Sequence, residues 1–235
     1  MKTVQLAAAA VAATLLTGAA EPVLADASVT VDIASAYVFR GITFNDGPVV
    51  QPGIEVSLHG LTLGAWGNLD LDDYDGAVAK NQFSEIDWYL GYGVEAGLAE
   101  FGIGYTEYTY PGAEGDADRE VSLGVGLDVP LSPELAVYYG VGGGIKKDIY
   151  VEAGIGHGFA LMDGLDLDLG AAIGYLSPDE GESGFSAWSL TAGVTYGMLG
   201  ASVTYYGQID DDVLPDGPGA YDVEVVGMLS LAIDI

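Results

Sequence analysis

Apolar and polar residues alternate with a period of two along most of this sequence. Successive side chains of a β-strand point to opposite faces, so this period predicts strands that are apolar on one face. No segment after residue 27 shows the 3.6-residue period of an amphipathic helix. Twelve alternating stretches are present, at residues 28–40, 48–58, 60–70, 84–95, 97–109, 119–129, 134–143, 148–158, 164–175, 185–196, 199–208 and 221–235. The chain is therefore predicted to be all-β.

The connections between these stretches form two classes that alternate along the chain. The short or tight ones are His59-Gly60, 95–97, 130–133, 159–163 and Gly197-Met198. The others are mostly longer and acidic, at 70–83, 111–118, 177–184 and 209–220, with 143–148 as a short exception. In an up-and-down antiparallel sheet this alternation places all long loops on one side.

One phase of the alternation is apolar nearly throughout, and the other is rich in Gly, Ser, Thr and carboxylates. In one stretch the apolar phase is Ile86, Trp88, Leu90, Tyr92 and Val94, and the polar phase is Glu85, Asp87, Gly91 and Gly93. Glycine weakens a strand by about 0.5–1 kcal/mol relative to alanine, but it leaves space inside a narrow barrel. We therefore predict a transmembrane up-and-down antiparallel β-barrel of about 12 strands, with the polar phase lining the lumen.

Aromatic residues of the apolar phase lie near both ends of the predicted strands, as interfacial girdles require. Those toward the long loops are Tyr37, Phe39, Trp88, Tyr105, Tyr175, Trp188, Tyr205 and Tyr221, and those toward the short turns are Phe101, Phe159 and Tyr196. A soluble sandwich with aromatic residues at its strand ends is the alternative. It would have to bury twelve apolar faces, whereas a bilayer solvates such faces and barrel closure pairs every strand edge.

The first residues have the pattern of a secretory signal, with Lys2, an apolar stretch from Val4 to Leu16, and small residues leading to VLADA. Cleavage is predicted after Ala25, with Ala27 as the alternative. Residues 1–25 are thus assigned as a signal peptide and residues 28–235 as a single outer-membrane β-barrel domain. An uncleaved anchor is disfavoured because the apolar core is shorter than the ~18 residues of a spanning helix.

The sequence carries 35 acidic residues against 6 basic ones, for a net charge of −29. Such a charge opposes binding to the polyanionic backbone of nucleic acids, so nucleic acid is not expected as a partner. Its 15 Tyr separate it from disordered acidic chains, which are poor in aromatic residues. Because the chain has no Cys, the barrel must be stable without disulfides.

Residues suited to catalysis or to metal binding are few. His59 lies in a predicted turn and His157 on the predicted lipid-facing phase, so neither is placed for a Ser-His pair or a metal site. Asp70 and Asp72 begin a segment that resembles a calcium loop, but Tyr74 stands where that loop needs an acid. No catalytic residue, cofactor or specific metal site is predicted. Loosely bound divalent ions at the acidic loops remain an alternative to simple solvation.

Carboxylates dominate the predicted lumen. The candidate pore-lining residues are Asp32, Glu55, Glu85, Asp87, Glu100, Glu120, Asp128, Glu152, Asp166, Asp168, Glu224 and Asp234, with Arg40 as the one cation among them. A low-dielectric wall focuses the field of such charges and concentrates cations inside. The first strand is expected to carry Arg40 to the outer mouth, where it would pair with Glu224 or Asp222 of the last strand. Neighbours on the second strand, Glu85 or Asp87 are alternative partners, and a solvated arginine at the rim is the other alternative.

The segment SAYVFRGIT, residues 35–43, gives the chain a family resemblance. It resembles the TorF-type porins, also called the Gcw_chp family of proteobacterial outer-membrane proteins, whose first strand ends in Ser-x-Tyr-Val-Phe-Arg-Gly-Ile-Ser/Thr. The matching residues are Ser35, Tyr37, Val38, Phe39, Arg40, Gly41, Ile42 and Thr43. Ala36 stands where members of the family often have Asp. The resemblance implies an outer-membrane barrel and indicates location better than activity.

The predicted function is that of a porin-like passive channel for small hydrophilic solutes, with a preference for cations. One alternative is a non-conducting barrel that acts as an adhesin or envelope scaffold, because inward tyrosines could fill the pore; they are Tyr89, Tyr108, Tyr138, Tyr150 and Tyr206. An outer-membrane lipid-modifying enzyme is a third hypothesis.

Four cations on the long-loop side are candidates for lipopolysaccharide contacts, with simple solubility as the alternative: Lys80, Arg119, Lys146 and Lys147. The sequence indicates neither the solute nor an oligomeric state.

Overall fold

A computed structural model describes residues 26–113, 115–217 and 219–235 as a closed antiparallel barrel. The predicted signal peptide, residues 1–25, lies outside the described residues. The barrel strands are β1 (Asp26–Ala34), β4 (Val49–Leu58), β5 (Leu61–Asp70), β6 (Phe83–Ala96), β7 (Ala99–Thr109), β8 (Asp118–Leu127), β9 (Glu134–Gly142), β10 (Ile149–Met162), β11 (Leu165–Ser177), β12 (Gly184–Tyr196), β13 (Leu199–Gln208) and β14 (Val225–Asp234). The prediction of a twelve-stranded up-and-down barrel is confirmed.

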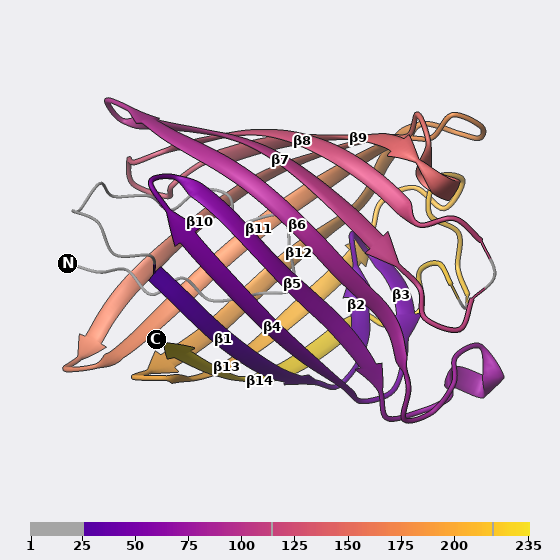
Figure 1. Cartoon of the computed structure of the whole chain (residues 1–235), viewed down its shortest axis with the longest axis horizontal. Coiled ribbons are helices and arrows are strands. Elements are labelled where there is room, and N and C mark those ends of the chain that lie inside the picture. The colour runs from indigo at the N-terminus through magenta and orange to yellow at the C-terminus, as the bar shows by residue number, and fades with distance from the viewer. Residues whose placement is uncertain (1–25, 114, 218) are drawn as a thin grey trace.

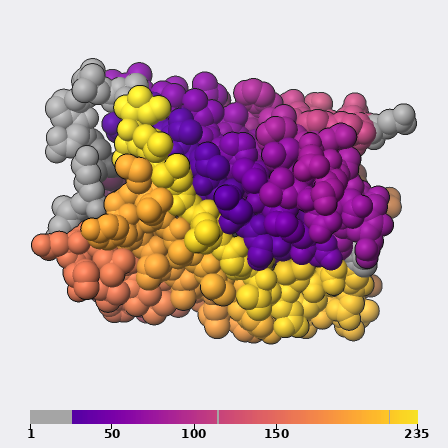
Figure 2. All heavy atoms as spheres, turned by 90° about the horizontal axis from the view of Figure 1, so that it is seen from below, coloured from indigo at the N-terminus to yellow at the C-terminus, as the bar shows by residue number. Residues whose placement is uncertain are grey.

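Closure of the barrel depends on pairing between the two ends of the chain. β1 pairs antiparallel with β4 on one side and with β14 on the other, where Asp32 lies opposite Ser230. Figure 2 shows this seam, with the C-terminal strand in yellow beside the N-terminal strand in indigo. A closed sheet has no free strand edge, so every strand backbone can be hydrogen-bonded within the sheet.

The connections separate into two ends, as predicted. The turn end holds the tight connections, such as His59-Gly60, and also the N-terminal end of β1 and the C-terminal end of β14 (Figure 1). The loop end holds the long connections, which include the short helical turns η2 (Tyr74–Gly76) and η3 (Gly143–Ile145). One predicted turn, residues 159–163, is placed too early, because β10 continues to Met162 and only Asp163-Gly164 connects it to β11. Among the described residues, no helix is long and apolar enough to cross a membrane.

The two faces of the barrel wall have opposite polarity. Outward side chains are apolar and exposed, as at Leu63, Leu123 and Leu229, which are 60%, 62% and 62% exposed. Polar side chains of the other phase are buried inside, as at Gln51 and Asn68. An apolar exterior around a polar interior is the pattern of a barrel solvated by lipid. The assignment of the phases is therefore confirmed.

Glycines of the inward phase leave space inside the barrel, and tyrosine side chains occupy it. A Cβ atom added at Gly64 would lie 2.2 Å from Cζ of Tyr89 on the neighbouring strand. A Cβ atom at Gly174 would lie 2.2 Å from Oη of Tyr150. No residue larger than glycine fits at either position without displacing a tyrosine ring.

The first predicted strand, 28–40, is shorter than expected. β1 ends at Ala34, and the following residues turn into the barrel as a separate hairpin of β2 (Tyr37–Phe39) and β3 (Ile42–Asn45) (Figure 1). Tyr37 is buried and packs against Trp66, with ring centroids 5.5 Å apart, so its assignment to a lipid-facing aromatic girdle was wrong. Phe39 likewise lies on the hairpin and not on the barrel wall.

The hairpin turns inward because an apolar pocket inside the barrel receives it. Tyr37 and Val38 belong to a buried cluster formed with the inner wall; its other members are Ala34, Ala36, Val49, Tyr206, Val226 and Met228. Burial of apolar side chains stabilises the folded state by about 25 cal/mol per Å² of apolar surface taken from water. The loop-end half of the lumen thus contains a small hydrophobic core.

We expect Gly174→Val to destabilise the barrel by about 1–3 kcal/mol, because the new side chain would overlap Tyr150. Gly170→Val is the matched control on the same strand and phase, since the nearest atom to a Cβ there is 3.8 Å away. Reversible unfolding in urea, followed by tryptophan fluorescence in detergent, measures both variants. Equal destabilisation by the two substitutions would contradict the packing of tyrosine over glycine.

Candidate functional site

The tip of the inward hairpin is a two-residue turn formed by Arg40 and Gly41. Both residues have positive φ angles, 55° and 85°, as the central residues of a type I′ hairpin turn require. Gly41 also approaches the far wall, where an added Cβ atom would lie 2.6 Å from Cβ of Ala187 on β12. Gly41 is therefore required both by its backbone conformation and by the lack of space.

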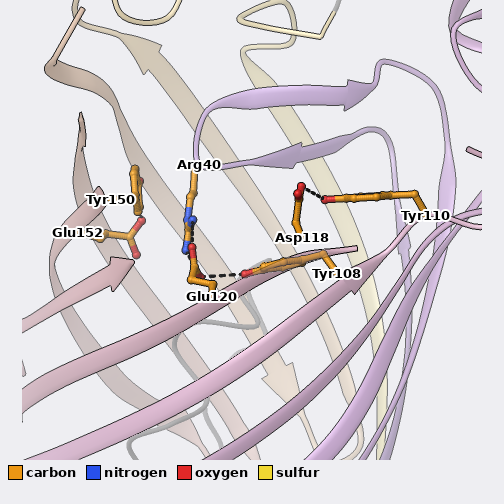
Figure 3. A network of polar contacts seen from close by, with 7 residues as sticks. All are labelled: Arg40, Tyr108, Tyr110, Asp118, Glu120, Tyr150 and Glu152. Carbon is orange, nitrogen blue, oxygen red and sulfur yellow. Dashed lines mark hydrogen bonds and ion pairs between the residues drawn. The ribbon is translucent and has the colours of Figure 1, made fainter. Parts of the chain in front are cut away.

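Arg40 is held by a carboxylate and by three aromatic rings. Its Nη1 and Nη2 atoms donate hydrogen bonds to the two carboxylate oxygens of Glu120 on β8, at 2.8 and 2.9 Å (Figure 3). The guanidinium carbon lies 4.7 Å from the ring centroid of Phe39, 4.3 Å from that of Tyr138 and 4.4 Å from that of Tyr150. Bidentate pairing combined with cation–π contacts gives a geometry that lysine could not reproduce.

The predicted pairing of Arg40 with Glu224 or Asp222 is wrong. Because β1 ends at Ala34, Arg40 does not rise to the closing seam but crosses toward β8. Glu224 is exposed ahead of β14, and Asp222 accepts a hydrogen bond from the Tyr74 hydroxyl in the loops. The prediction treated the whole first stretch as one straight strand.

Other residues of the SAYVFRGIT segment anchor the hairpin to several parts of the wall. The Tyr37 hydroxyl donates to Glu85 Oε2 on β6 at 2.9 Å. Ser35 exchanges hydrogen bonds with Gly227 of β14, since its N–H donates to the Gly227 carbonyl and its hydroxyl accepts from the Gly227 N–H. Thr43 Oγ1 accepts from the Val223 N–H. Together with the contact to β8, these bonds make the hairpin a brace across the lumen.

The inward carboxylates lie at two levels, which follow from their positions along the strands. The loop-end group, close to the hairpin, is Asp32, Glu85, Asp87, Glu120 and Glu152. The turn-end group is Glu55, Glu100, Asp166 and Asp168. Arg40 reaches only the loop-end group. Within the described residues, Glu55, Asp166 and Asp168 form no ion pair with a basic side chain.

The candidate pore residues differ in burial. Asp32, Glu85, Asp87 and Glu120 are buried, whereas Arg40, Glu55, Glu100, Glu152, Asp166 and Asp168 are partly exposed. Asp128, Glu224 and Asp234 are exposed at or near strand ends. The structure therefore brings together the buried members around the hairpin and leaves the others spread along the wall.

The four candidate lipopolysaccharide contacts all lie at the loop end. Lys147 donates a hydrogen bond to Asp179 at 2.8 Å, and this bond raises the pKa of the Lys147 ammonium. Arg119 lies 3.6 Å from Glu107 in an exposed pair. Two of the four cations are thus already paired with carboxylates of the chain, and Lys80 and Lys146 are exposed.

The hairpin was missed in the sequence, although two signals pointed to it. Tyr37, Val38 and Phe39 are three consecutive apolar residues, which breaks the alternation expected of a wall strand. Val226 and Met228 are apolar side chains on the otherwise polar inward phase, and they line the cluster that receives the hairpin. Apolar residues facing a predicted lumen indicate that something inside covers them.

A double-mutant cycle tests the brace. We expect Arg40→Gln and Glu120→Gln each to cost about 3 kcal/mol of unfolding free energy, because each leaves a buried group without its partner. The double variant should cost well below the sum of the two. Arg119→Gln with Glu107→Gln is the matched cycle for an exposed pair, and its coupling should be about 0–1 kcal/mol. Additive effects at Arg40 and Glu120 in urea unfolding would refute the brace.

The solved structures that resemble this chain include membrane proteins. A membrane protein solved in work on in-meso crystallization is 10% identical, with 89% of this chain and 84% of that chain covered and a TM-score of 0.50. An outer membrane channel from Pseudomonas putida F1 is 12% identical over 92% of this chain and 97% of its own, with a TM-score of 0.49. Salmonella typhi OmpF, solved with daunomycin, is 9% identical over 90% and 97%, with a TM-score of 0.42. Such low identities bear on the fold alone.

Sequence comparison identifies the family. No curated protein matches the sequence. Residues 17–216 match the family Gcw_chp, described as a bacterial protein of unknown function. This match includes the SAYVFRGIT segment and extends from before β1 through β13. The chain therefore belongs to the Gcw_chp family.

Proposed function

We propose that this protein is an outer-membrane channel, narrowed by its own hairpin, that passes small hydrophilic solutes and prefers cations. The observation that carries the proposal is the excess of inward carboxylates over inward cations. At least nine carboxylates from seven strands face the interior, whereas Arg40, which is paired with Glu120, is the one inward-facing basic side chain among the described residues. A lumen of this charge concentrates cations and repels anions.

The turn-end carboxylates make the stronger contribution to this preference. Glu55, Glu100, Asp166 and Asp168 are partly exposed, so they act on ions in water and not only on their neighbours. The Glu55 carboxylate accepts a hydrogen bond from the Tyr89 hydroxyl, which fixes it against the wall. A ring of fixed charges at one end of a narrow pore is a common basis of charge selectivity.

The hairpin favours a second candidate, a barrel that does not conduct and serves as an adhesin or envelope scaffold. Tyr108, Tyr138, Tyr150 and Tyr206 are buried inside, as that alternative required, and the hairpin adds its own side chains to them. Tyr89 is partly exposed at the turn-end level. The two candidates thus differ in whether water and ions pass the hairpin.

An enzymatic role has less support. His59 lies in a turn outside the lumen wall, and His157 is exposed on the outward face, where its ring packs against Phe159 at 4.6 Å. Neither histidine is placed to activate a nucleophile inside the barrel.

We propose lipopolysaccharide contacts for the exposed loop-end cations Lys80 and Lys146, together with export through the N-terminal signal peptide.

Planar-bilayer recording of the refolded barrel tests the channel proposal. We expect single-channel currents whose reversal potential in a potassium chloride gradient lies toward the potassium equilibrium potential. Asp166→Asn with Asp168→Asn should reduce this preference, because it removes two of the turn-end charges. Glu180→Gln with Glu182→Gln removes the same charge from an exposed loop at the opposite end of the barrel and should have a smaller effect. An anion preference in the wild-type barrel would contradict the proposal.

Removal of the hairpin tests whether it sets the size of the pore. We expect replacement of residues 36–45 by a short Gly-Ser linker to raise single-channel conductance severalfold, because the brace no longer fills the loop-end lumen. Replacing residues 179–182 in the same way is the control, since these residues lie in the β11–β12 loop. If wild type is silent and the hairpin variant conducts, the scaffold candidate replaces the channel.

A further inference from the structure

Glu85 and Asp87 form a buried pair of acids on the inner face of β6. They are two residues apart on one strand and therefore point to the same face. Glu85 is 4% exposed and Asp87 is 1% exposed, and their carboxyl groups lie within hydrogen-bonding reach of each other. Asp70 of β5 lies close enough to Glu85 to act on it electrostatically. Acidic groups in such proximity require neutralisation.

Side chains around the pair donate hydrogen bonds to Glu85 and to the nearby Asp70. The Tyr37 hydroxyl donates to Glu85 Oε2 at 2.9 Å. Asp70 Oδ1 accepts from the side-chain amides of Asn45 and Asn68, at 2.6 and 2.9 Å. Hydrogen bonds directed at a carboxylate favour its charged form. Glu85 and Asp70 are therefore held as hydrogen-bond acceptors, whereas Asp87 Oδ1 receives no donor.

No basic side chain of the described residues balances this charge. Both terminal nitrogens of Arg40 donate hydrogen bonds to Glu120. The remaining described cations lie in the loops or at a strand's loop end: Lys80, Arg119, Lys146 and Lys147. Asp87 Oδ1 and Oδ2 of the nearby Asp70 are fully buried and have no hydrogen-bond partner; Asp32 Oδ1 and Asp168 Oδ2 are the other such carboxylate oxygens of the described residues. Unpartnered buried oxygens beside a second carboxylate are what a bound cation would satisfy.

We propose that Glu85 and Asp87 bind a hard divalent cation of the calcium class inside the barrel, beside the Tyr37 edge of the hairpin. All of the available donors are oxygens, which suit calcium or magnesium and not softer metals. Two carboxylates would neutralise the divalent charge, and water would complete the coordination, because calcium takes six to eight oxygen ligands. The cation would also tie β6 to the hairpin, since Tyr37 is already bonded to Glu85.

This site is separate from the acidic loops and does not depend on conduction. Asp210, Asp211 and Asp212 form the one compact group of three carboxylates among the described residues, but Asp211 and Asp212 are exposed. That cluster shows no buried unpartnered oxygen. It is a source of background binding that the experiment has to remove.

Terbium luminescence of the refolded full-length mature barrel tests the proposal, because Tb³⁺ replaces Ca²⁺ at oxygen sites and is sensitised by nearby aromatic rings. Trp66 lies opposite Asp87 in the β5–β6 register and packs against Tyr37. The background protein carries Asp210→Asn, Asp211→Asn and Asp212→Asn. We expect it to retain a Ca²⁺-competable signal, and Asp87→Asn should weaken its Ca²⁺ affinity roughly tenfold or more. Glu180→Gln with Glu182→Gln, which removes two acids of the exposed β11–β12 loop, is the control and should leave the signal unchanged.

Two results would overturn the site. One is loss of all Ca²⁺-competable luminescence in the background protein, which would place binding at the loops alone. The other is an infrared band of a protonated carboxyl group at neutral pH that disappears in Asp87→Asn, which would show that the two acids share a proton. The luminescence measurement uses only the background protein, in which Glu85 and Asp87 are intact, so it decides the proposal even if Asp87→Asn does not fold. A barrel that binds Ca²⁺ but passes no current would refute only the channel.

Discussion

The contact between Arg40 and Glu120 holds the inward hairpin in place across the lumen of this barrel. A twelve-stranded barrel encloses more space than its wall side chains fill, and here the chain fills part of that space with its own hairpin. The hairpin is tethered at its base through Ser35, and at its tip the guanidinium of Arg40 joins Glu120 on β8 between the rings of Tyr138 and Tyr150. Without that contact the tip would have only apolar packing to hold it.

The brace also divides the charges of the lumen. Near the hairpin, tyrosine hydroxyls and Arg40 bind carboxylates, so Glu85 and Glu120 are parts of a buried polar network. Toward the turn end, Asp166 and Asp168 meet no basic side chain of the described chain and remain partly exposed. We propose that the first group stabilises and closes the interior and that the second sets charge preference. On this proposal, one acidic lumen serves both stability and selectivity.

The sequence predicted the wall of the barrel well and its interior poorly. Period-two alternation is a local property, so strands such as β6 and β11 could be placed within a few residues, together with the phase that faces lipid. The inward turn after Ala34 depends instead on a pocket built by Val49, Val226 and Met228, which are distant in sequence. Likewise, Arg40 pairs with Glu120 because the hairpin crosses the lumen toward β8. Counting residues along a straight first strand therefore could not identify this partner. The motif was recognised, but its three-dimensional role required the fold.

Nuclear magnetic resonance of the ¹⁵N-arginine-labelled barrel tests the brace most directly, because Arg40 and Arg119 are the only arginines of the sequence. Arg119 has a side chain 44% exposed and serves as the internal reference, whereas that of Arg40 is 14% exposed. The account predicts resolved guanidinium protons for Arg40 that exchange slowly with water and are shifted upfield by the rings of Tyr138 and Tyr150. Two arginines with the same rapid exchange and unshifted signals would show that the hairpin does not lie across the lumen.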